Sequence, residues 1–230
     1  MNLLIPGSSG FIGTNFKNLS KFRNYQDADL LVNKPVEIDF SGVDTVLHLS
    51  ALVHQMQGAP EEEYFKINTD LAYEVASLAK KNGVKHFILL STVKVFGEET
   101  TGDTPLKEDS PCNPTDPYGK SKLQAEKKIL ALEGGNFVFS VIRPPLVYGP
   151  GVKGNMINLV KMVDKYKYLP LGNIHNRRTM VSVKNLIALI DKVIETRKSG
   201  VFIASDPEPV STSELVRTIA GNFKSSKKIL

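Results

Sequence analysis

A tyrosine and a lysine stand four residues apart where a proline-rich turn gives way to a helical pattern. In the stretch NPTDPYGKSKLQAEKK, Tyr118 and Lys122 are one helical turn apart, so their side chains leave the same face of the predicted helix. A free phenol has a pKa near 10 and is a weak acid–base catalyst at neutral pH. An ammonium one turn away favours the phenolate, so we expect the pKa of Tyr118 to fall toward the working pH. There it can exchange a proton with a substrate oxygen.

Three glycines follow the first apolar run of the chain. In GSSGFIG, Gly7, Gly10 and Gly13 come directly after the predicted strand NLLIP and open the periodic helix pattern FIGTNFKNL. Glycine permits a tight turn and the close approach of a backbone to a pyrophosphate, and a helix N-terminus offers unpaired N–H groups. A purely structural turn is the alternative. The strand before and the helix after favour a dinucleotide-binding loop that includes Phe11 and Ile12.

Strands alternate with helices along most of the chain. Continuous apolar strands are predicted in VDTVLHLSA, KHFILLST and NFVFSVIRP, with helices between them. This order predicts an α/β Rossmann fold, a doubly wound parallel sheet. The helix in NTDLAYEVASLAKKNG is expected to start near Asn68 or Thr69. Residues 24–43 are short, and we place no full second strand with a terminal acidic or basic residue there, so NAD and NADP both stay open.

The pattern changes after about residue 151. We expect residues 1–150 to form a Rossmann NAD(P)-binding domain. Residues 151–230 read as a mixed segment that completes the sheet and forms part of a smaller, discontinuous C-terminal substrate-binding domain. Helices are predicted in NMINLVKMV and NLIALIDKVIE, and a strand in VFIAS. A capping box from Ser211 to Glu214 predicts the start of a last helix.

The composition excludes several classes of protein. With 230 residues, of which 41% are hydrophobic, the chain can bury a sizeable core, and no apolar run reaches the roughly 20 residues that cross a membrane. The single cysteine, Cys112, cannot form an internal disulfide, so we expect a cytoplasmic protein with no membrane partner. The net charge of +5 lacks the dense basic face of a nucleic-acid binder and suits an anionic small molecule. No His, Cys or Asp cluster has metal-ligand spacing.

Taken together, the motifs resemble the extended short-chain dehydrogenase/reductase family, in its nucleotide-sugar 4-epimerase and 4-keto-reductase branch. The resemblance covers essentially the whole chain, through GSSGFIG, VDTVLHLSA, FKINTDLA, STVKVFGE, DPYGKSKLQAE, VIRPPLVYGPG and RRTMVSV in the family's order. It implies an enzyme with a catalytic triad of Thr92, Tyr118 and Lys122. Thr92 would bind the substrate oxygen, Tyr118 would move the proton, and Lys122 would also hold the nicotinamide ribose. Ser91 is the alternative hydroxyl and is expected to face elsewhere.

The resemblance also implies contacts to a cofactor and a substrate. The cofactor is NAD, with NADP not excluded, and its implied contacts besides the glycine loop are Asp39, Phe40, Leu49, Ser50, Ala51, Asn68, Tyr118, Lys122 and Pro145. An N-cap role for Asn68 is equally open. Asn155 and Arg178 match positions that hold the diphosphate of a UDP-sugar, a task suited to a guanidinium. His175 reads as a loop residue. The family's homodimer would use the helices after Asn68 and Tyr118.

Two departures and one absence bear on the reaction. Leu146 replaces an asparagine of many epimerases, and the chain stops at KSSKKIL before the relatives' substrate domain is complete, which indicates a truncated chain. Thr92 is followed by Val93 and Lys94 rather than the Asp–Glu pair of a 4,6-dehydratase. The resemblance therefore implies a UDP-sugar 4-epimerase or a UDP-4-keto-6-deoxy-N-acetylhexosamine 4-reductase in surface-polysaccharide biosynthesis. A non-catalytic dinucleotide-binding redox sensor is the alternative, although such proteins usually lose the tyrosine or the lysine.

Overall fold

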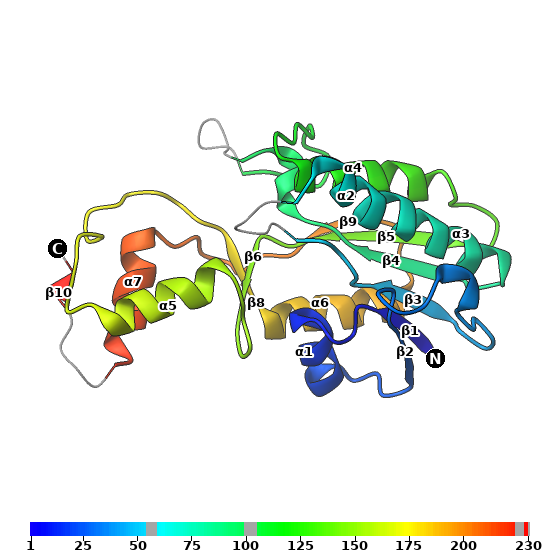
Figure 1. The fold of residues 1–230 in the computed structure, drawn as a ribbon, viewed down its shortest axis with the longest axis horizontal. Coiled ribbons are helices and arrows are strands. Elements are labelled where there is room, and N and C mark those ends of the chain that lie inside the picture. The colour runs from blue at the N-terminus through cyan, green and yellow to red at the C-terminus, as the bar shows by residue number, and fades with distance from the viewer. Residues whose placement is uncertain (54–58, 99–104, 224–227, 230) are drawn as a thin grey trace.

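A six-stranded parallel sheet forms the centre of the molecule. The structure is a computed structural model that describes residues 1–53, 59–98, 105–223 and 228–229. The strand order is β2-β1-β3-β4-β5-β9 (Figure 1). The strands are β1 (Leu3–Pro6), β2 (Tyr25–Ala28), β3 (Thr45–His48), β4 (His86–Leu90), β5 (Val138–Arg143) and β9 (Gly200–Ile203). Every neighbouring pair is parallel, which confirms the predicted Rossmann-type sheet.

Helices cover both faces of this sheet. On one face lie α2 (Glu61–Tyr64), the π-helical turn η2 (Phe65–Leu71), α3 (Ala72–Lys81) and α4 (Pro117–Leu130). On the other face lie α1 (Phe11–Leu19) and α6 (Val183–Thr196), as Figure 1 shows. Two 3-10 turns, η1 (Pro35–Glu37) and η3 (Val93–Phe96), follow β2 and β4.

The strands contribute side chains to two separate hydrophobic clusters, one on each face of the sheet. Leu3 and Ile5 of β1 pack with Phe16 of α1 on the α6 side, whereas Leu4 packs with Phe87 on the α3 side. Successive side chains of a strand point to opposite faces, so a strand covered on both sides must be apolar at every position. This requirement explains the continuous Val and Leu runs of the sequence.

A second strand is present where none was predicted. β2 pairs with β1 from Leu3↔Tyr25 to Pro6↔Ala28 at the edge of the sheet. Its sequence YQDA can be polar, because Gln26 and Asp27 are exposed and only Ala28 is buried. An exposed edge strand needs no apolar run. The expectation that residues 24–43 hold no full second strand was therefore wrong.

The helix that carries Asn68 begins earlier than predicted. α2 begins at Glu61 and places three glutamates in its first turn, where negative charge favours the helix dipole. The chain then runs through η2 into α3 without leaving helical geometry. Asn68 thus lies inside the helical run, and both the predicted start near it and its alternative N-cap role were wrong.

The second half of the chain contributes to the sheet and to a smaller lobe. β6 (Leu146–Tyr148) pairs with β8 (Met180–Ser182), and beyond them lie α5 (Asn155–Lys165), β7 (Tyr168–Leu169), α7 (Thr212–Gly221) and β10 (Lys228–Ile229). The lobe packs around Val163, Leu169 and Val216. The predicted capping box of Ser211 and Glu214 is confirmed at the start of α7. Within the described ranges, no helix has the length and apolar character needed to cross a membrane.

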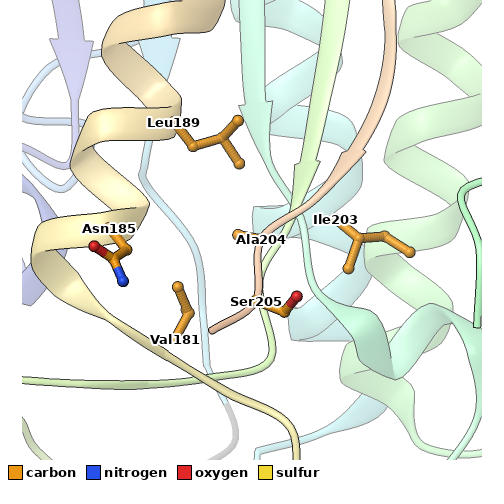
Figure 2. A pocket seen from close by; sticks show the side chains of 6 residues that line it. All are labelled: Val181, Asn185, Leu189, Ile203, Ala204 and Ser205. Carbon is orange, nitrogen blue, oxygen red and sulfur yellow. The ribbon is translucent and has the colours of Figure 1, made fainter. Parts of the chain in front are cut away.

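A small cavity of about 200 Å³ opens between α6 and the ends of β8 and β9 (Figure 2). Its lining is Val181, Asn185, Leu189, Ile203, Ala204 and Ser205. None of these residues was predicted to bind cofactor or substrate. Asn185 is already committed to structure, since its Nδ2 donates to Asp206 Oδ1 at 2.7 Å.

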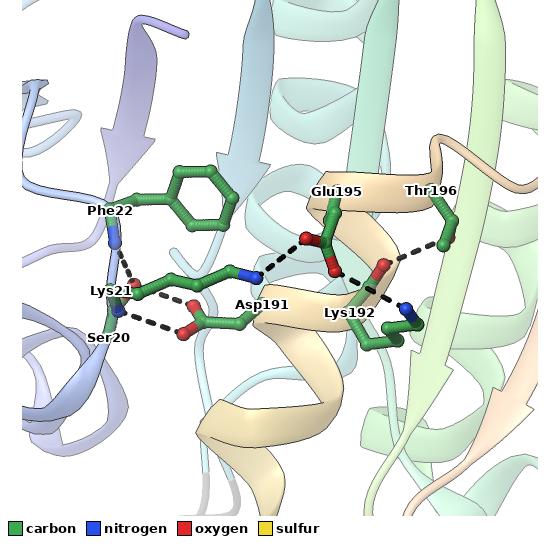
Figure 3. A network of polar contacts seen from close by, with 7 residues as sticks. All are labelled: Ser20, Lys21, Phe22, Asp191, Lys192, Glu195 and Thr196. Atoms are coloured by element: carbon green, nitrogen blue, oxygen red, sulfur yellow. Dashed lines mark hydrogen bonds and ion pairs between the residues drawn. The ribbon is translucent and has the colours of Figure 1, made fainter.

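A polar network joins the segment just after α1 to α6 (Figure 3). Asp191 of α6 accepts from Ser20 Oγ at 2.6 Å and from the backbone N–H of Lys21 at 2.9 Å. The Lys21 ammonium lies 2.9 Å from Glu195 Oε1. The carboxylate of Asp191 thereby fixes the chain just past the C-terminus of α1, the helix whose other end carries the glycine loop.

Candidate active site

The glycine loop ends at an open helix N-terminus. Gly10 is the N-cap of α1, with no side-chain capping hydrogen bond and no acidic residue in the first turn. The first N–H groups of a helix have no intrahelical partner, so the amides after Gly10 point out of the helix end. Uncapped amides and the positive end of the helix dipole together suit a phosphate.

The three glycines of the loop differ in how much room they leave for a side chain. Gly7 has φ of +84°, and a Cβ there would lie 2.5 Å from the backbone N of Ser50. A Cβ on Gly13 would lie 2.4 Å from the carbonyl oxygen of Ser8. At Gly10 the nearest atom would be the Gly7 carbonyl oxygen at 3.3 Å. Packing of the chain therefore demands Gly7 and Gly13, whereas Gly10 leaves the space above the loop clear.

Asn68 fixes the segment that follows β3. Its Oδ1 accepts from the Leu52 N–H at 2.7 Å, and its Nδ2 donates to the Leu52 carbonyl at 2.9 Å and to Ser121 Oγ at 3.0 Å. The predicted cofactor-lining residues Leu49, Ser50 and Ala51 precede Leu52 and are half-buried. Asn68 itself is fully buried, so in this structure it holds the lining segment against α4.

The residues predicted near the adenine lie beyond η1. Phe40 is buried in the core cluster on the α3 side, and Asp39 is exposed and accepts from the Ser41 N–H at 2.8 Å.

Sequence reasoning missed Asp29, which directly follows β2. The Ala28 carbonyl accepts from the Gly7 N–H at 3.4 Å, which brings this strand end to the glycine loop. An acidic residue about 20 positions after such a loop is the usual partner of an NAD ribose 2′-hydroxyl, so the spacing from Gly10 was a usable signal.

The start of α4 is held against η3. Asp116 is the N-cap of α4 and accepts from the Gly119 N–H at 3.0 Å, and Pro117 follows at the first helical position. Lys94 of η3 reaches the same carboxylate, with its Nζ 3.2 Å from Asp116 Oδ2. A Cβ on Gly119 would lie 2.7 Å from the Lys94 carbonyl oxygen. The glycine thus allows α4 to approach η3 closely. The Asp–Pro pair, a typical helix start, could have revealed this cap from the sequence.

This approach brings the predicted triad together. Thr92 is the N-cap of η3, with its Oγ1 accepting from the Lys94 N–H at 3.2 Å, and its side chain is near enough to the Tyr118 phenol to favour the phenolate. Lys122 is one turn further along α4 and is buried, and its Nζ donates to the Leu90 carbonyl at 2.8 Å. The hydroxyl of Ser91 instead donates to Glu126, as expected for a strand-end hydroxyl that faces away.

The phenol of Tyr118 is not activated in the chain by itself. Burial raises the pKa of Tyr118 to about 12, and the Thr92 hydrogen bond, which favours the phenolate, offsets only part of that effect. The expectation of a lowered Tyr118 pKa is therefore wrong for the protein without its ligands. The physical reason is that loss of water around the phenolate, with the negative charge of Asp116 acting in the same direction, outweighs the effect of Thr92.

Lys122 and His48 are both buried and interact electrostatically. Burial lowers the pKa of Lys122 to about 8, partly opposed by the charge of Glu126. Burial and then the charge of Lys122 lower the pKa of His48 to about 3. His48 is therefore neutral at working pH, and its ring stacks on Phe87 with centroids 5.8 Å apart. The predicted triad therefore includes a buried lysine, Lys122, whose pKa is close to the working pH.

The remaining predicted cofactor contact, Pro145, and the predicted substrate contacts Asn155 and Arg178 follow α4 in the chain. Pro145 follows β5 and is half-buried, next to Pro144, whose carbonyl accepts from the Val93 N–H at 3.1 Å. Asn155 opens α5 and is exposed. Arg178 is exposed too, and its backbone pairs with Val210 in both directions at 2.9 Å. Asn155 and Arg178 belong to the smaller lobe, so the structure places them apart from the α4 cluster and leaves their predicted roles as predictions.

The fold and the glycine loop define an α/β protein of the dinucleotide-binding type. Residues 12–203 match the NAD dependent epimerase/dehydratase family. This match covers most of the chain, so the protein belongs to the NAD dependent epimerase/dehydratase family. The membership confirms the predicted enzyme class and its nicotinamide cofactor. Within the described residues, no group of three or more His, Cys, Asp or Glu side chains is arranged to hold a metal ion.

Named relatives agree with this membership. A UDP-glucose 4-epimerase of Vibrio cholerae is 36% identical and aligns with 95% of this chain and 75% of its own length. An N-acetyl-alpha-D-glucosaminyl-diphospho-ditrans,octacis-undecaprenol 4-epimerase of Escherichia coli is 29% identical over 99% of this chain and 73% of its own. The crystal structure of a UDP-glucuronic acid 4-epimerase from Bacillus cereus in complex with NAD superposes with a TM-score of 0.78. It covers all of this chain and 87% of its own, at 22% identity, and so supports the fold.

Proposed function

We propose that this protein is an NAD-dependent enzyme that modifies a nucleotide sugar at carbon 4, and that the modification is 4-epimerisation. The observation that carries the proposal is the placement of Tyr118 one turn before a buried Lys122, with Thr92 near the phenol. The two curated relatives described above both carry 4-epimerase names, which favours epimerisation over 4-keto reduction.

The residues present fit NAD. The uncapped amides after Gly10 would hold the pyrophosphate, and the bare position of Gly10 itself leaves room for it. Asp29 would accept a hydrogen bond from a ribose hydroxyl and would repel the extra phosphate of NADP. Lys122 would reach the nicotinamide ribose. When bound, NAD would supply the hydride acceptor and donor for carbon 4 of the sugar.

The side chains of the chain itself would move the proton. Thr92 would donate a hydrogen bond to the sugar oxygen at carbon 4, beside the phenol of Tyr118. The phenolate of Tyr118 would take the proton from that oxygen as hydride leaves, and would return it after the sugar has turned. Burial disfavours this phenolate in the protein without its ligands, so the positive charge of the oxidised nicotinamide would add to that of Lys122 in favouring it. Lys122 is the cation that the chain supplies.

The substrate would be a UDP-sugar, held at its diphosphate by Asn155 and Arg178. Both residues are exposed on the smaller lobe and carry donors suited to phosphate oxygens. On this proposal residues 1–150 bind the cofactor, and residues 151–230 complete the sheet and form part of the substrate-binding domain. A homodimer through α3 and α4 would follow the family's pattern.

Cofactor content and turnover test this proposal together. The purified protein is denatured, the released nucleotide is identified, and the native protein is incubated with UDP-glucose, UDP-GlcNAc, and UDP-4-keto-6-deoxy-GlcNAc with NADH. Bound NAD with formation of the 4-epimer and no net cofactor use supports the epimerase. Stoichiometric NADH oxidation on the keto sugar would replace it with the reductase. Absence of both bound dinucleotide and turnover would favour a non-catalytic sensor, and full activity of Tyr118→Phe would refute the acid–base role.

A further inference from the structure

A buried ion pair lies behind the predicted triad. Arg143, at the end of β5, donates from Nη2 to Glu126 Oε2 at 2.6 Å and from Nε to Glu126 Oε1 at 3.2 Å. The two side chains are only 6% and 7% exposed. Burying two charges costs desolvation that their attraction repays only in part, so such a pair is weak support for stability alone. Its location offers a better reason for it.

Glu126 links the two elements that carry the triad. It is one helical turn beyond Lys122 and two turns beyond Tyr118, on the same face of α4. Its carboxylate also accepts the hydroxyl hydrogen of Ser91, the residue directly before Thr92. A shift of Glu126 would therefore be transmitted to the threonine on one side and to the lysine on the other.

Arg143 braces the same segment from a second direction. Its guanidinium lies 4.8 Å from the ring centroid of Phe96 in η3, and its Nη1 donates to the Glu108 carbonyl at 3.3 Å. The backbone of the threonine segment is bonded to the end of β5, through Ser91 N–H to the Ile142 carbonyl at 2.7 Å. The segment that presents Thr92 is thus held through both its backbone and its side chains.

We propose that Glu126, paired with Arg143 and bonded to Ser91, is a positioning residue that fixes the Thr92 hydroxyl near Tyr118 and holds a carboxylate one turn from Lys122. This inference rests on the proposed function, since it assigns a task within that triad. His48 of β3 and Glu126 of α4 interact electrostatically with Lys122, and Tyr118 is one turn before it on α4. His48 is neutral and Tyr118 is protonated, so Glu126 is the charge among them that holds the proton on Lys122.

Three variants of the full chain separate this role from a structural one. Ser91→Ala keeps the ion pair and removes only the link to the threonine segment. The double variant Glu126→Met with Arg143→Met removes both charges and fills the same space with apolar atoms, so the fold is expected to survive. Asp70→Asn is the matched control. It breaks an ion pair on the outer face of α4, where the Lys128 Nζ lies 2.8 Å from Asp70 Oδ1.

The expected readouts are a loss of kcat without a matching loss of binding, and a shifted lysine titration. We expect Ser91→Ala to lower kcat about tenfold and the double variant about 100-fold, with KM changed by less than about twofold. The Lys122 titration, followed by NMR of its labelled Cε, should move to lower pH in the double variant and stay in place in Ser91→Ala. The control should match the wild type in both.

The outcomes keep this inference apart from the proposed function. A folded double variant with wild-type kcat and an unmoved Lys122 titration would overturn the positioning role and leave the enzyme assignment intact. If the wild type turns over none of the sugars, the proposed function fails. In that case the Lys122 titration in the same variants still decides whether Glu126 acts on the lysine. Should the double variant unfold, Ser91→Ala decides, and an unchanged kcat there would refute the link to Thr92.

Discussion

Lys122 is a buried cation that the fold holds at a cost. Its pKa falls from 10.5 to about 8 on folding, because burial penalises the ammonium. At about 1.4 kcal/mol for each pKa unit, the charged form costs on the order of 3 kcal/mol. The cost applies in full below pH 8, where the lysine is charged in both states. It vanishes as the pH rises toward 10.5, where the lysine is neutral in both.

We therefore expect Lys122→Met to stabilise the protein while abolishing turnover. The variant loses the hydrogen bond to the Leu90 carbonyl, so the net gain at pH 7 should be about 1–3 kcal/mol. Urea unfolding at pH 7 and at pH 10 measures it, and the gain should shrink at the higher pH. Lys120→Met, an exposed substitution on the same helix, is the control. A variant less stable than the wild type at pH 7 would contradict the assigned cost.

We expect Asp29 to set the choice between NAD and NADP. Replacing its carboxylate with the amide of Asn removes a charge that would repel a 2′-phosphate, so Asp29→Asn should improve NADP binding relative to NAD about tenfold or more. Equilibrium binding of the two dinucleotides measures the ratio. Asp27→Asn is the matched control, since its carboxylate, 2.6 Å from Lys17 Nζ, is engaged with α1. An equal shift in both variants would show a general charge effect.

At the level of elements, the glycine loop contains one glycine, Gly13, that the fold requires and another, Gly10, that a bound dinucleotide would require. Gly10→Val should keep the native circular dichroism spectrum and lose dinucleotide binding. Gly10 has ordinary extended backbone, and a new side chain would meet little but the place of the phosphates. Gly13→Ala should cost about 1–3 kcal/mol of stability, because its Cβ collides with the backbone of Ser8. Thermal melts and NAD titrations check the pair. Retained NAD affinity in Gly10→Val would remove the phosphate role.

The elements that the sequence predicted well are those with a continuous or periodic apolar pattern. β3 and β4 are buried along their lengths, and α6 and α7 show helical spacing and side-chain caps. β2 escaped notice because an edge strand keeps polar residues. The start at Glu61 escaped because Asn68 resembles a cap, whereas its amide bonds to Leu52 and Ser121, far away in the sequence. Such tertiary partners leave no local signal.

The sequence likewise predicted some parts of the site and not others. The spacing of Tyr118 and Lys122 was enough to place them on one helix face, and the threonine position came from a motif. The raised pKa of Tyr118 was not predictable, because it depends on burial by residues from other elements. Nor was the ion pair of Glu126 and Arg143, which joins a helix to the end of a strand.

On the scale of the whole molecule, a single carboxylate ties the sheet to the smaller lobe. Asp206 accepts from Tyr148 Oη at 2.7 Å, from the Ser182 N–H at 3.0 Å and from Asn185 Nδ2 at 2.7 Å. These three groups belong to β6, β8 and α6. Because β6 and β8 lead into the smaller lobe, Asp206 fixes the strands from which the predicted diphosphate contacts extend.

Two buried histidines should make the whole fold sensitive to acid. Burial lowers the pKa of His48 to about 3 and that of His86 to about 4. Below pH 6.5 the unfolded chain takes up protons that the folded chain refuses, so stability falls as the pH drops toward those values. At pH 5 the loss is on the order of 2 kcal/mol for each ring.

We expect His48→Leu to remove about half of this acid sensitivity. Leucine fills the site beside Phe87 without a titrating group, so the fall in unfolding free energy between pH 7 and pH 5 should shrink by about 2 kcal/mol. Urea unfolding at the two pH values measures this change. His175→Gln, which alters an exposed loop histidine, should leave the fall unchanged. If the unfolding free energy of His48→Leu falls between pH 7 and pH 5 as steeply as that of the wild type, proton uptake by the buried ring does not weaken the fold in acid.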